Sequence, residues 1–195
     1  MKSNFLKKAA AAVIAAMLAV SVMTGCSSDD GSPAITKISN KSAEDSLPGG
    51  YKLSEYNEEQ QGKLYLTEGG MIIINAYNYT KEDLPDMATW ADSACANIRL
   101  TNIMMYGQDT DFHDPENVKV CGLDGIRYDT EIKQYTQFDE DGNKLEEGSF
   151  RLRGRNYFFF SGYNAYVIMF SCYEEDWDEK SAQFEEFVND LKVTK

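Results

Sequence analysis

The stretch SFRLRGRNYFFFSGYNAYVIMFSC, from Ser149 to Cys172, decides the fold. Two long runs rich in aromatic and aliphatic residues flank Gly162-Tyr163-Asn164, which is a turn signal, and this pattern predicts a β-hairpin. In both runs apolar residues stand at consecutive positions, so each predicted strand carries apolar side chains on both of its faces. Such strands must be covered on both sides, and the stretch therefore predicts a sheet with a packing layer above and below it.

More strands are predicted between residue 63 and this hairpin. Lys63–Thr67 and Met71–Ala76 flank a Glu68-Gly69-Gly70 turn and indicate a first hairpin. After a polar loop at Gln108–Asn117, the same reasoning gives the following elements: a strand Val118–Cys121, a turn Gly122–Gly125, a strand Ile126–Phe138 and a hairpin turn Asp139–Asn143. Hairpin connections this short join antiparallel strands, because parallel strands need long crossovers.

Two helices are predicted from apolar residues at helical spacing. The first carries its stripe at Met87, Trp90, Ala91, Ala94, Cys95 and Ile98. Its start lies within Thr80–Asp86, with Asp83 as the candidate N-cap, and its end lies near Leu100–Ile103. The second follows the acidic segment Glu174–Asp178 and has its stripe at Trp177, Phe184, Phe187, Val188 and Leu191. Together with the strands, these helices predict an α+β domain, an antiparallel β-sheet flanked by helices.

From about Gly50 to Lys195 the chain resembles the PsbP-like (Mog/PsbP) family. The resemblance rests on the first hairpin, the Trp90-centred helix, VCGLDGIRYDTE (Val120–Glu131) and the ending YVIMFSCYEEDWDEKSAQFEEFVNDLKV (Tyr166–Val193). It implies an α/β/α sandwich, frequent occurrence in bacterial lipoproteins, and action by docking to larger complexes without shared catalytic residues. These motifs are patterns of apolar spacing and glycine, and cystatin-like or nuclear-transport-factor-like α+β folds imitate them.

The N-terminal residues have the order of a secretory signal. Lys2, Lys7 and Lys8 precede an apolar run, and from Ala9 to Val22 this run is about 14 residues long, short of the ~20 of a membrane-spanning helix. Its end, Val22-Met23-Thr24-Gly25-Cys26, resembles a bacterial lipobox, although Met23 stands where Leu is commoner. In lipoproteins of that kind the peptidase cuts before the cysteine, whose thiol carries acyl chains such as palmitate. The alternative is an ordinary cleaved signal with a chance cysteine.

We therefore expect three parts: a lipoprotein signal peptide over 1–25, the lipidated Cys26 with a flexible linker over 26–48, and the PsbP-like domain over 49–195. The linker range is rich in Ser, Asp, Gly, Asn and Lys, and Pro48-Gly49-Gly50 marks its end. The whole chain of 195 residues has a net charge of −13. Removing the signal leaves 16 of its 19 basic residues against all 32 acidic ones. An acidic surface of this size argues against nucleic acid as a partner.

Three cysteines remain besides Cys26, and an odd number cannot pair completely. One disulfide can form, with Cys121 and Cys172 as the candidate pair because both lie in predicted strands. The interpretation that we favour is that Cys95, Cys121 and Cys172 are small buried apolar residues. They lack CxxC spacing and are a poor zinc set, so no metal site is predicted from them.

Chemistry-bearing residues are sparse. The only histidine, His113, lies in DTDFHDPEN with Asp111 and Asp114 beside it, and this is the one candidate for a metal-dependent or hydrolytic enzyme. A lone loop histidine among solvated acids more often has neither role. The acidic turn at Asp139–Asn143 imitates the start of a calcium loop, but Lys144 stands where that loop needs glycine. No catalytic residue, cofactor or metal is therefore predicted.

The sequence predicts a location more firmly than an activity. We expect a non-enzymatic lipoprotein on the extracytoplasmic face of the cell membrane, held there by its lipid. Its domain would be a binding or assembly module for an envelope protein or a small extracellular ligand. Tyrosines in the predicted strands, such as Tyr128, Tyr157 and Tyr166, offer a binding face, but they also suit a half-buried pleated surface.

Overall fold

The structure is a computed structural model of the chain, and it describes residues 37–40, 52–57, 62–67, 70–106, 110–132, 135–138, 144–148 and 151–194. Its elements follow in this order: β1 (Lys37–Asn40), β2 (Lys52–Asn57), β3 (Gly62–Thr67), β4 (Gly70–Asn78), α2 (Met87–Tyr106), β5 (Asp111–Phe112), β6 (Glu116–Val120), β7 (Leu123–Ile132), β8 (Tyr135–Phe138), β9 (Lys144–Gly148), β10 (Leu152–Ser161), β11 (Asn164–Tyr173), the 3₁₀ turn η2 (Glu174–Asp176), α3 (Trp177–Asp190) and β12 (Leu191–Thr194).

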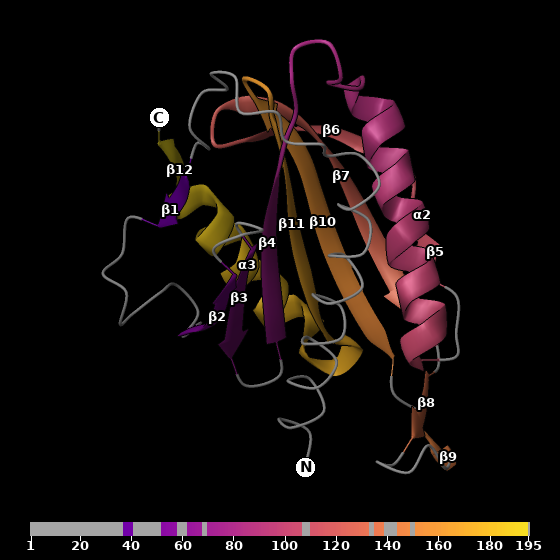
Figure 1. Cartoon of the computed structure of the whole chain (residues 1–195). Helices are drawn as coiled ribbons and strands as arrows, with labels where there is room; N and C mark the ends of the chain where they lie inside the picture. The colour runs from indigo at the N-terminus through magenta and orange to yellow at the C-terminus, as the bar shows by residue number, and fades with distance from the viewer. Residues whose placement is uncertain are drawn as a thin grey trace.

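An eight-stranded antiparallel sheet forms the centre of the molecule (Figure 1). Its strand order is β2-β3-β4-β11-β10-β7, and both β5 and β6 pair with the outer side of β7. The short pairs β1–β12 and β8–β9 stand apart from this sheet. The strand pairs are antiparallel throughout, as the short connections predict.

The central hairpin is β10–β11, and it lies where the opening stretch predicts it. Ser161 pairs with Asn164, so the turn consists of Gly162 and Tyr163 alone. Gly162 has a φ of 62°, the left-handed region that favours glycine, at the first central position of a tight hairpin turn. The ten paired positions that follow place β10 and β11 in the middle of the sheet.

The two helices cover opposite faces of this sheet (Figure 1). Successive residues of a strand point to opposite faces, so Phe158 packs in the cluster that includes Trp90 of α2, while Phe159 packs in the cluster that includes Phe184 of α3. Both phenylalanines are fully buried. The α+β class and the α/β/α sandwich are thus confirmed.

The start of α2 differs from the prediction. The backbone N–H of Thr89 donates to Asp86 Oδ1 at 2.9 Å, so Asp86 is the N-cap and the prediction of Asp83 was wrong. Asp83 instead belongs to the turn before the helix, where Thr80 Oγ1 donates to its Oδ2 at 2.6 Å. The helix also continues beyond the expected end, to Tyr106.

The turn between β6 and β7 lies earlier than predicted. Val120 pairs with Leu123, so the turn consists of Cys121 and Gly122, with φ values of 53° and 79°. Two positive φ values in a two-residue loop are those of a type I′ turn, whose twist matches the flanking strands. Residues 123–125, which the sequence assigns to the turn, are already part of β7.

Several predicted ranges lie wholly or partly outside the described residues. Residues 1–25 and Cys26 are outside, so the signal peptide and the lipidation site stay predictions. Within the predicted linker the structure describes only Lys37–Asn40, which form β1 and pair with β12. In the described part of the chain no helix is long and apolar enough to cross a membrane.

Candidate functional site

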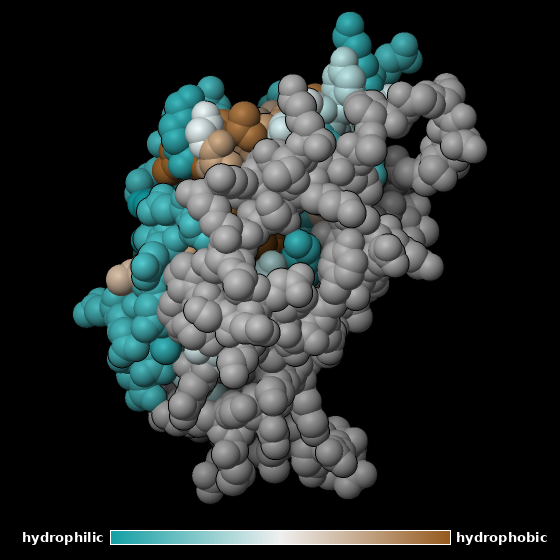
Figure 2. Space-filling view, turned by 90° about the vertical axis from the view of Figure 1, so that its left-hand side faces the viewer, coloured by the Kyte–Doolittle hydropathy of each residue, from teal (hydrophilic) through white to brown (hydrophobic). Residues whose placement is uncertain are grey.

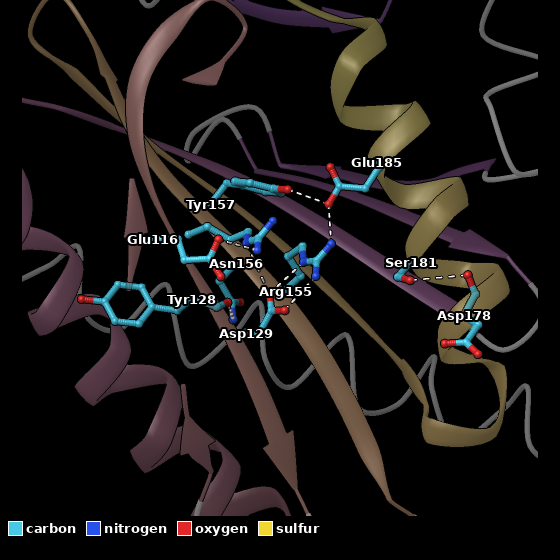
Figure 3. A network of polar contacts seen from close by, with 10 residues as sticks. Glu116, Tyr128, Asp129, Arg155, Asn156, Tyr157, Asp178, Ser181 and Glu185 are labelled. Atoms are coloured by element: carbon cyan, nitrogen blue, oxygen red, sulfur yellow. Dashed lines mark hydrogen bonds and ion pairs between the residues drawn. The ribbon is translucent and has the colours of Figure 1, made fainter. Parts of the chain in front are cut away.

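Alternating charged side chains on β7 and β10 form an extended polar arrangement, and Figure 3 shows the part of it around Asp129 and Arg155. We call it the charged face and define it by Arg127, Asp129, Glu131, Arg153 and Arg155. These residues occupy every second position of their strands, and they lie on the side of the sheet that α3 covers. The strand register sets Arg155 opposite Asp129 and Arg153 opposite Glu131, so opposite charges stand directly across from each other.

Arg155 is the centre of the charged face. Its Nε and Nη2 donate to the two carboxylate oxygens of Asp129, both at 2.7 Å. Its Nη1 donates to Glu185 Oε1 of α3 at 2.5 Å, and the hydroxyl of Tyr157 donates to the same oxygen at 2.7 Å. Figure 3 shows Glu185 pointing from α3 towards both residues. One guanidinium group therefore joins β7, β10 and α3.

Arg127 extends these contacts towards the edge of the sheet. Its Nη2 donates to Glu116 Oε2 of β6 at 2.7 Å, and its Nε lies 3.8 Å from Asp129 Oδ1. The side chain of Glu116 is 62% exposed, whereas that of Arg127 is 22% exposed. The charged face thus runs from a half-buried centre beneath α3 to a solvated edge at β6.

The pKa directions show that Asp129 and Arg155 are held in their charged forms and Tyr157 in its neutral form. Burial alone would raise the pKa of Asp129, but the hydrogen bonds and charge of Arg155, with Arg127 and His113 nearby, outweigh it and hold that pKa below its usual range. The hydrogen bonds to Asp129 raise the pKa of Arg155 still further above neutrality. Burial, together with the hydrogen bond to Glu185, raises the pKa of Tyr157. The arrangement is suited to ionic recognition and packing.

Trp177, the first residue of α3, receives two arginines of β10 over its ring. The guanidinium carbon of Arg153 lies 4.3 Å from the ring centroid and that of Arg155 lies 5.4 Å from it. Contacts of this kind are cation–π interactions, in which the positive guanidinium group of arginine is attracted to the face of the tryptophan ring. The position of Trp177 at the start of α3 and the positions of Arg153 and Arg155 on β10 therefore bring the three side chains into contact.

His113 lies beside the charged face, next to the backbone of Asp129. Its backbone N–H donates to the carbonyl oxygen of Asp129 at 2.9 Å, and its charge contributes to lowering the pKa of the Asp129 carboxyl. Asp111 pairs across from Glu131, and Asp114 is exposed in the loop that follows. The described residues contain no group of three or more His, Cys, Asp or Glu side chains that could hold a metal ion.

The three cysteines of the domain are free thiols in the structure. Burial raises the pKa of Cys95 and of Cys172 to about 12, and that of Cys121 to about 11. Cys121 lies in the β6–β7 turn, near the position where Gly125 pairs with Phe159 and Phe159 pairs with Tyr166 of β11. Cys172 lies six residues after Tyr166 along β11, and six residues of a strand span roughly 20 Å. A disulfide needs Cα atoms within about 7 Å, so this structure gives the candidate pair no support.

Sequence reasoning missed the charged face. The signal was present as charges at every second position of IRYDTEI in β7 and of RLRGR, which begins at Arg151 directly before β10. Its meaning depends on which strands are neighbours and in which register, and the sequence alone does not supply that. The strand tyrosines, considered as a binding face, are core residues instead: Tyr128, Tyr157, Tyr166 and Tyr173 are buried.

Comparison with known proteins shows a shared fold. No protein-family model and no curated protein sequence matches the chain. Among solved structures, the cyanobacterial PsbP (CyanoP) of Synechocystis sp. PCC 6803 matches 87% of this chain and 98% of its own, with 10% identity and a TM-score of 0.50. LpqN of Mycobacterium tuberculosis, described as involved in cell envelope biogenesis, matches 85% of this chain and 88% of its own, with 11% identity and a TM-score of 0.48. The likeness to CyanoP confirms the PsbP-like fold that the sequence resemblance implies.

Proposed function

We propose that the chain is a bacterial lipoprotein of the extracytoplasmic face, held in the cell membrane by acyl chains on Cys26, and that its domain is a non-enzymatic binding or assembly module. The lipobox-like Val22–Cys26 and the short apolar run before it support the anchor. The PsbP-like fold supports the choice of a docking module, because the resemblance implies action by docking.

The observation that carries the non-enzymatic part is the mutual neutralisation of the charged face. A general acid or base works best when its pKa lies near the operating pH. The pKa of Asp129 is instead lowered, and those of Arg155 and Tyr157 are raised, away from neutrality. These side chains satisfy one another and hold α3 on the sheet, an arrangement suited to presenting a stable surface.

The partner that we propose is an envelope protein or a small extracellular ligand. The acidic balance of the chain disfavours nucleic acid. The solvated edge at β6 offers charges of both signs to a partner, since Lys119 and Asp124 form an exposed pair there at 2.6 Å. We place no catalytic residue on this surface.

The anchor is tested by expressing the full chain and a Cys26→Ala variant in a bacterial host. We expect the parent chain in the membrane fraction, digestible by protease added outside the inner membrane, with a mature mass that includes acyl chains. The Cys26→Ala chain is expected to lack both the acyl mass and the membrane association. Equal distribution of the two chains would refute the anchor.

The module is tested by solubilising native membranes gently and separating them on a density gradient. We expect the protein to sediment with a second polypeptide, in a complex heavier than the monomer, because an assembly module functions by association. Sedimentation as a monomer would contradict assembly.

The alternative enzyme centred on His113 is tested with divalent ions: a thermal shift in the parent that His113→Ala abolishes would favour it over our proposal.

A further inference from the structure

The β1–β12 pair joins the N-terminal part of the chain to the end of α3, and we call this pair the strap. β12 begins where α3 ends, and the backbone N–H of its first residue, Leu191, donates to the carbonyl oxygen of Val188. Leu191 is buried and packs in the core cluster on the α3 face of the sheet. All four residues of β1 pair with β12, from Lys37 opposite Thr194 to Asn40 opposite Leu191. The core therefore holds the strand with which β1 pairs.

The strap lies on the α3 side of the molecule. Figure 1 shows β1 and β12 side by side near α3, whereas α2 covers the other face of the sheet. Figure 2 views the molecule from the side on which the strap lies in Figure 1, and most of the described residues in view there are hydrophilic. A chain that enters the domain through β1 therefore reaches it from the α3 side.

The pairing of β1 with β12 shortens the connection to the proposed anchor. Ten residues, 27–36, lie between Cys26 and β1, whereas 25 residues, 27–51, lie between Cys26 and β2. At full extension the first connection spans roughly 36–40 Å and the second roughly 86–94 Å. The strap thus more than halves the distance by which the domain can move away from its lipid, and it holds the domain on the α3 side.

The strap is basic in an acidic chain. Residues 31–43 and 191–195 each contain two lysines and no Asp or Glu, and Lys37 and Lys192 lie within the paired strands. The whole chain has 32 acidic and 19 basic residues, and α3 exposes acids such as Glu186. The surface of an anionic membrane attracts basic segments and repels acidic ones. On the α3 side, the strap is therefore a segment that such a membrane attracts.

We propose that the strap is the membrane-facing end of the domain and docks on the anionic headgroups of the bilayer in which Cys26 is anchored. This inference rests on the proposed function. The place where the tether joins the domain and the lysines of the strap support the same end independently of each other. The pairing of the strap keeps the domain close to the bilayer, and its charge turns this end towards the headgroups. α2 then faces away from the bilayer.

The experiment uses the full lipidated chain in vesicles of phosphatidylethanolamine and phosphatidylglycerol that carry an energy acceptor on the headgroups. A donor dye is attached through Thr194→Cys in the strap or through Met104→Cys on the exposed side of α2, each in a Cys121→Ser background. We expect energy transfer at position 194 to be at least about twofold stronger than at position 104, because much of the width of the domain separates the two positions.

Prolines in β1 test whether the strap holds the domain. Residues of antiparallel strands alternate between hydrogen-bonded and non-hydrogen-bonded pairs, so Ile38→Pro together with Ser39→Pro removes at least one ladder donor. We expect this double variant to lower the transfer at position 194 towards that at position 104. The matched control is Ser42→Pro together with Ala43→Pro, directly after β1, which should keep the transfer of the parent.

The lysines are tested by Lys37→Gln together with Lys192→Gln, which removes two charges and leaves the backbone pairing in place. We expect this variant in anionic vesicles to show the weaker transfer at position 194 that the parent shows in vesicles of neutral phosphatidylcholine. Equal transfer from the parent in both kinds of vesicle would overturn docking on anionic headgroups.

The outcomes separate this inference from the proposed function. A chain that floats with the vesicles and gives equal transfer at positions 194 and 104 would overturn the inference and leave the anchor intact. Unchanged transfer in the β1 proline variant would also overturn it, because the strap would then not be what holds the domain near the bilayer. A chain that neither floats with vesicles nor carries acyl mass would overturn the anchor itself. Equal melting temperatures of the labelled chains by circular dichroism verify that each is folded.

Discussion

Arg155 and Asp129 face each other across β10 and β7 and share two hydrogen bonds of equal length, 2.7 Å each. Both side chains are mostly withdrawn from water, at 15% and 20% exposure. The two-pronged geometry matches the planar guanidinium to the carboxylate, and the third donor of Arg155 reaches Glu185 of α3. The pair therefore sets the position of α3 over the strands as well as the pairing of the strands themselves.

Replacing Arg155 tests this role. We expect Arg155→Leu to lower the free energy of unfolding by about 2–3 kcal/mol, because Asp129 and Glu185 keep their partial burial and lose their shared cation. Arg155→Lys should cost about 1 kcal/mol, since an ammonium group cannot bind both oxygens of Asp129 and Glu185 together. The control is Lys119→Gln, which breaks an exposed pair and should cost about 0.5 kcal/mol or less in urea unfolding. Equal losses in all three variants would contradict the role of Arg155.

The lowered pKa of Asp129 predicts how stability depends on acid. The unfolded chain binds a proton at this carboxyl at a higher pH than the folded chain does, so the contribution is complete above the unfolded pKa of about 3.9. It is lost as the pH falls through the lower pKa of the folded state. In urea unfolding from pH 7 to pH 2, the stability difference between the parent and Asp129→Asn should stay constant above about pH 5 and then shrink. A difference that grows in acid would refute the assigned direction.

The N-cap of α2 gives a matched pair of variants. Asp86→Ala removes the acceptor for the Thr89 N–H, whereas Asp83→Ala removes only the local contact with Thr80. Thermal unfolding should therefore show a larger decrease in melting temperature for Asp86→Ala than for Asp83→Ala. A larger decrease in melting temperature for Asp83→Ala would indicate that Asp83 is the N-cap.

The layers of this fold could be predicted from the sequence because they depend on local pattern. Apolar residues on both faces of residues 149–172 demand cover on both sides, and Gly162 marks the turn between the two strands. The exact helix start could not be predicted, since Asp83 and Asp86 are the same residue type within one turn of each other. Only the folded backbone decides which carboxylate reaches the open N–H groups.

The charged face could not be predicted for a different reason. Arg155 and Asp129 lie 26 residues apart, and their contact exists only in the register that β7 and β10 adopt. The β6–β7 turn was misplaced because Cys121 holds a positive φ that its residue type rarely adopts, while the glycines around it suggested a later turn. The contact between Arg155 and Asp129 and the place of the β6–β7 turn both depend on how the strands pair in the folded protein.

The thiols provide a test of the candidate disulfide. Cys95 and Cys172 are buried, and burial raises their pKa to about 12, so neither should react with a thiol reagent at pH 8 in the folded protein. After denaturation without reductant, we expect three reactive thiols in the lipidated chain, because the register keeps Cys121 far from Cys172. A single reactive thiol would show that a disulfide had formed after all.

Gly154 of β10 leaves no room for a side chain at the centre of the sheet. A Cβ atom there would lie 2.5 Å from Thr130 Oγ1 and 2.7 Å from the carbonyl oxygen of Phe170, both closer than real contacts allow. We expect Gly154→Ala to lower the free energy of unfolding by about 3 kcal/mol, because the backbone of β11 cannot yield without breaking the hairpin. Adding Thr130→Ala removes only one of the two clashes and should not restore stability.

The control is Gly122→Ala, in the open β6–β7 turn with a φ of 79°, which should cost about 1 kcal/mol from backbone conformation alone. Urea unfolding of the three variants measures the order, and a Gly154→Ala chain as stable as Gly122→Ala would show that the strands can move apart.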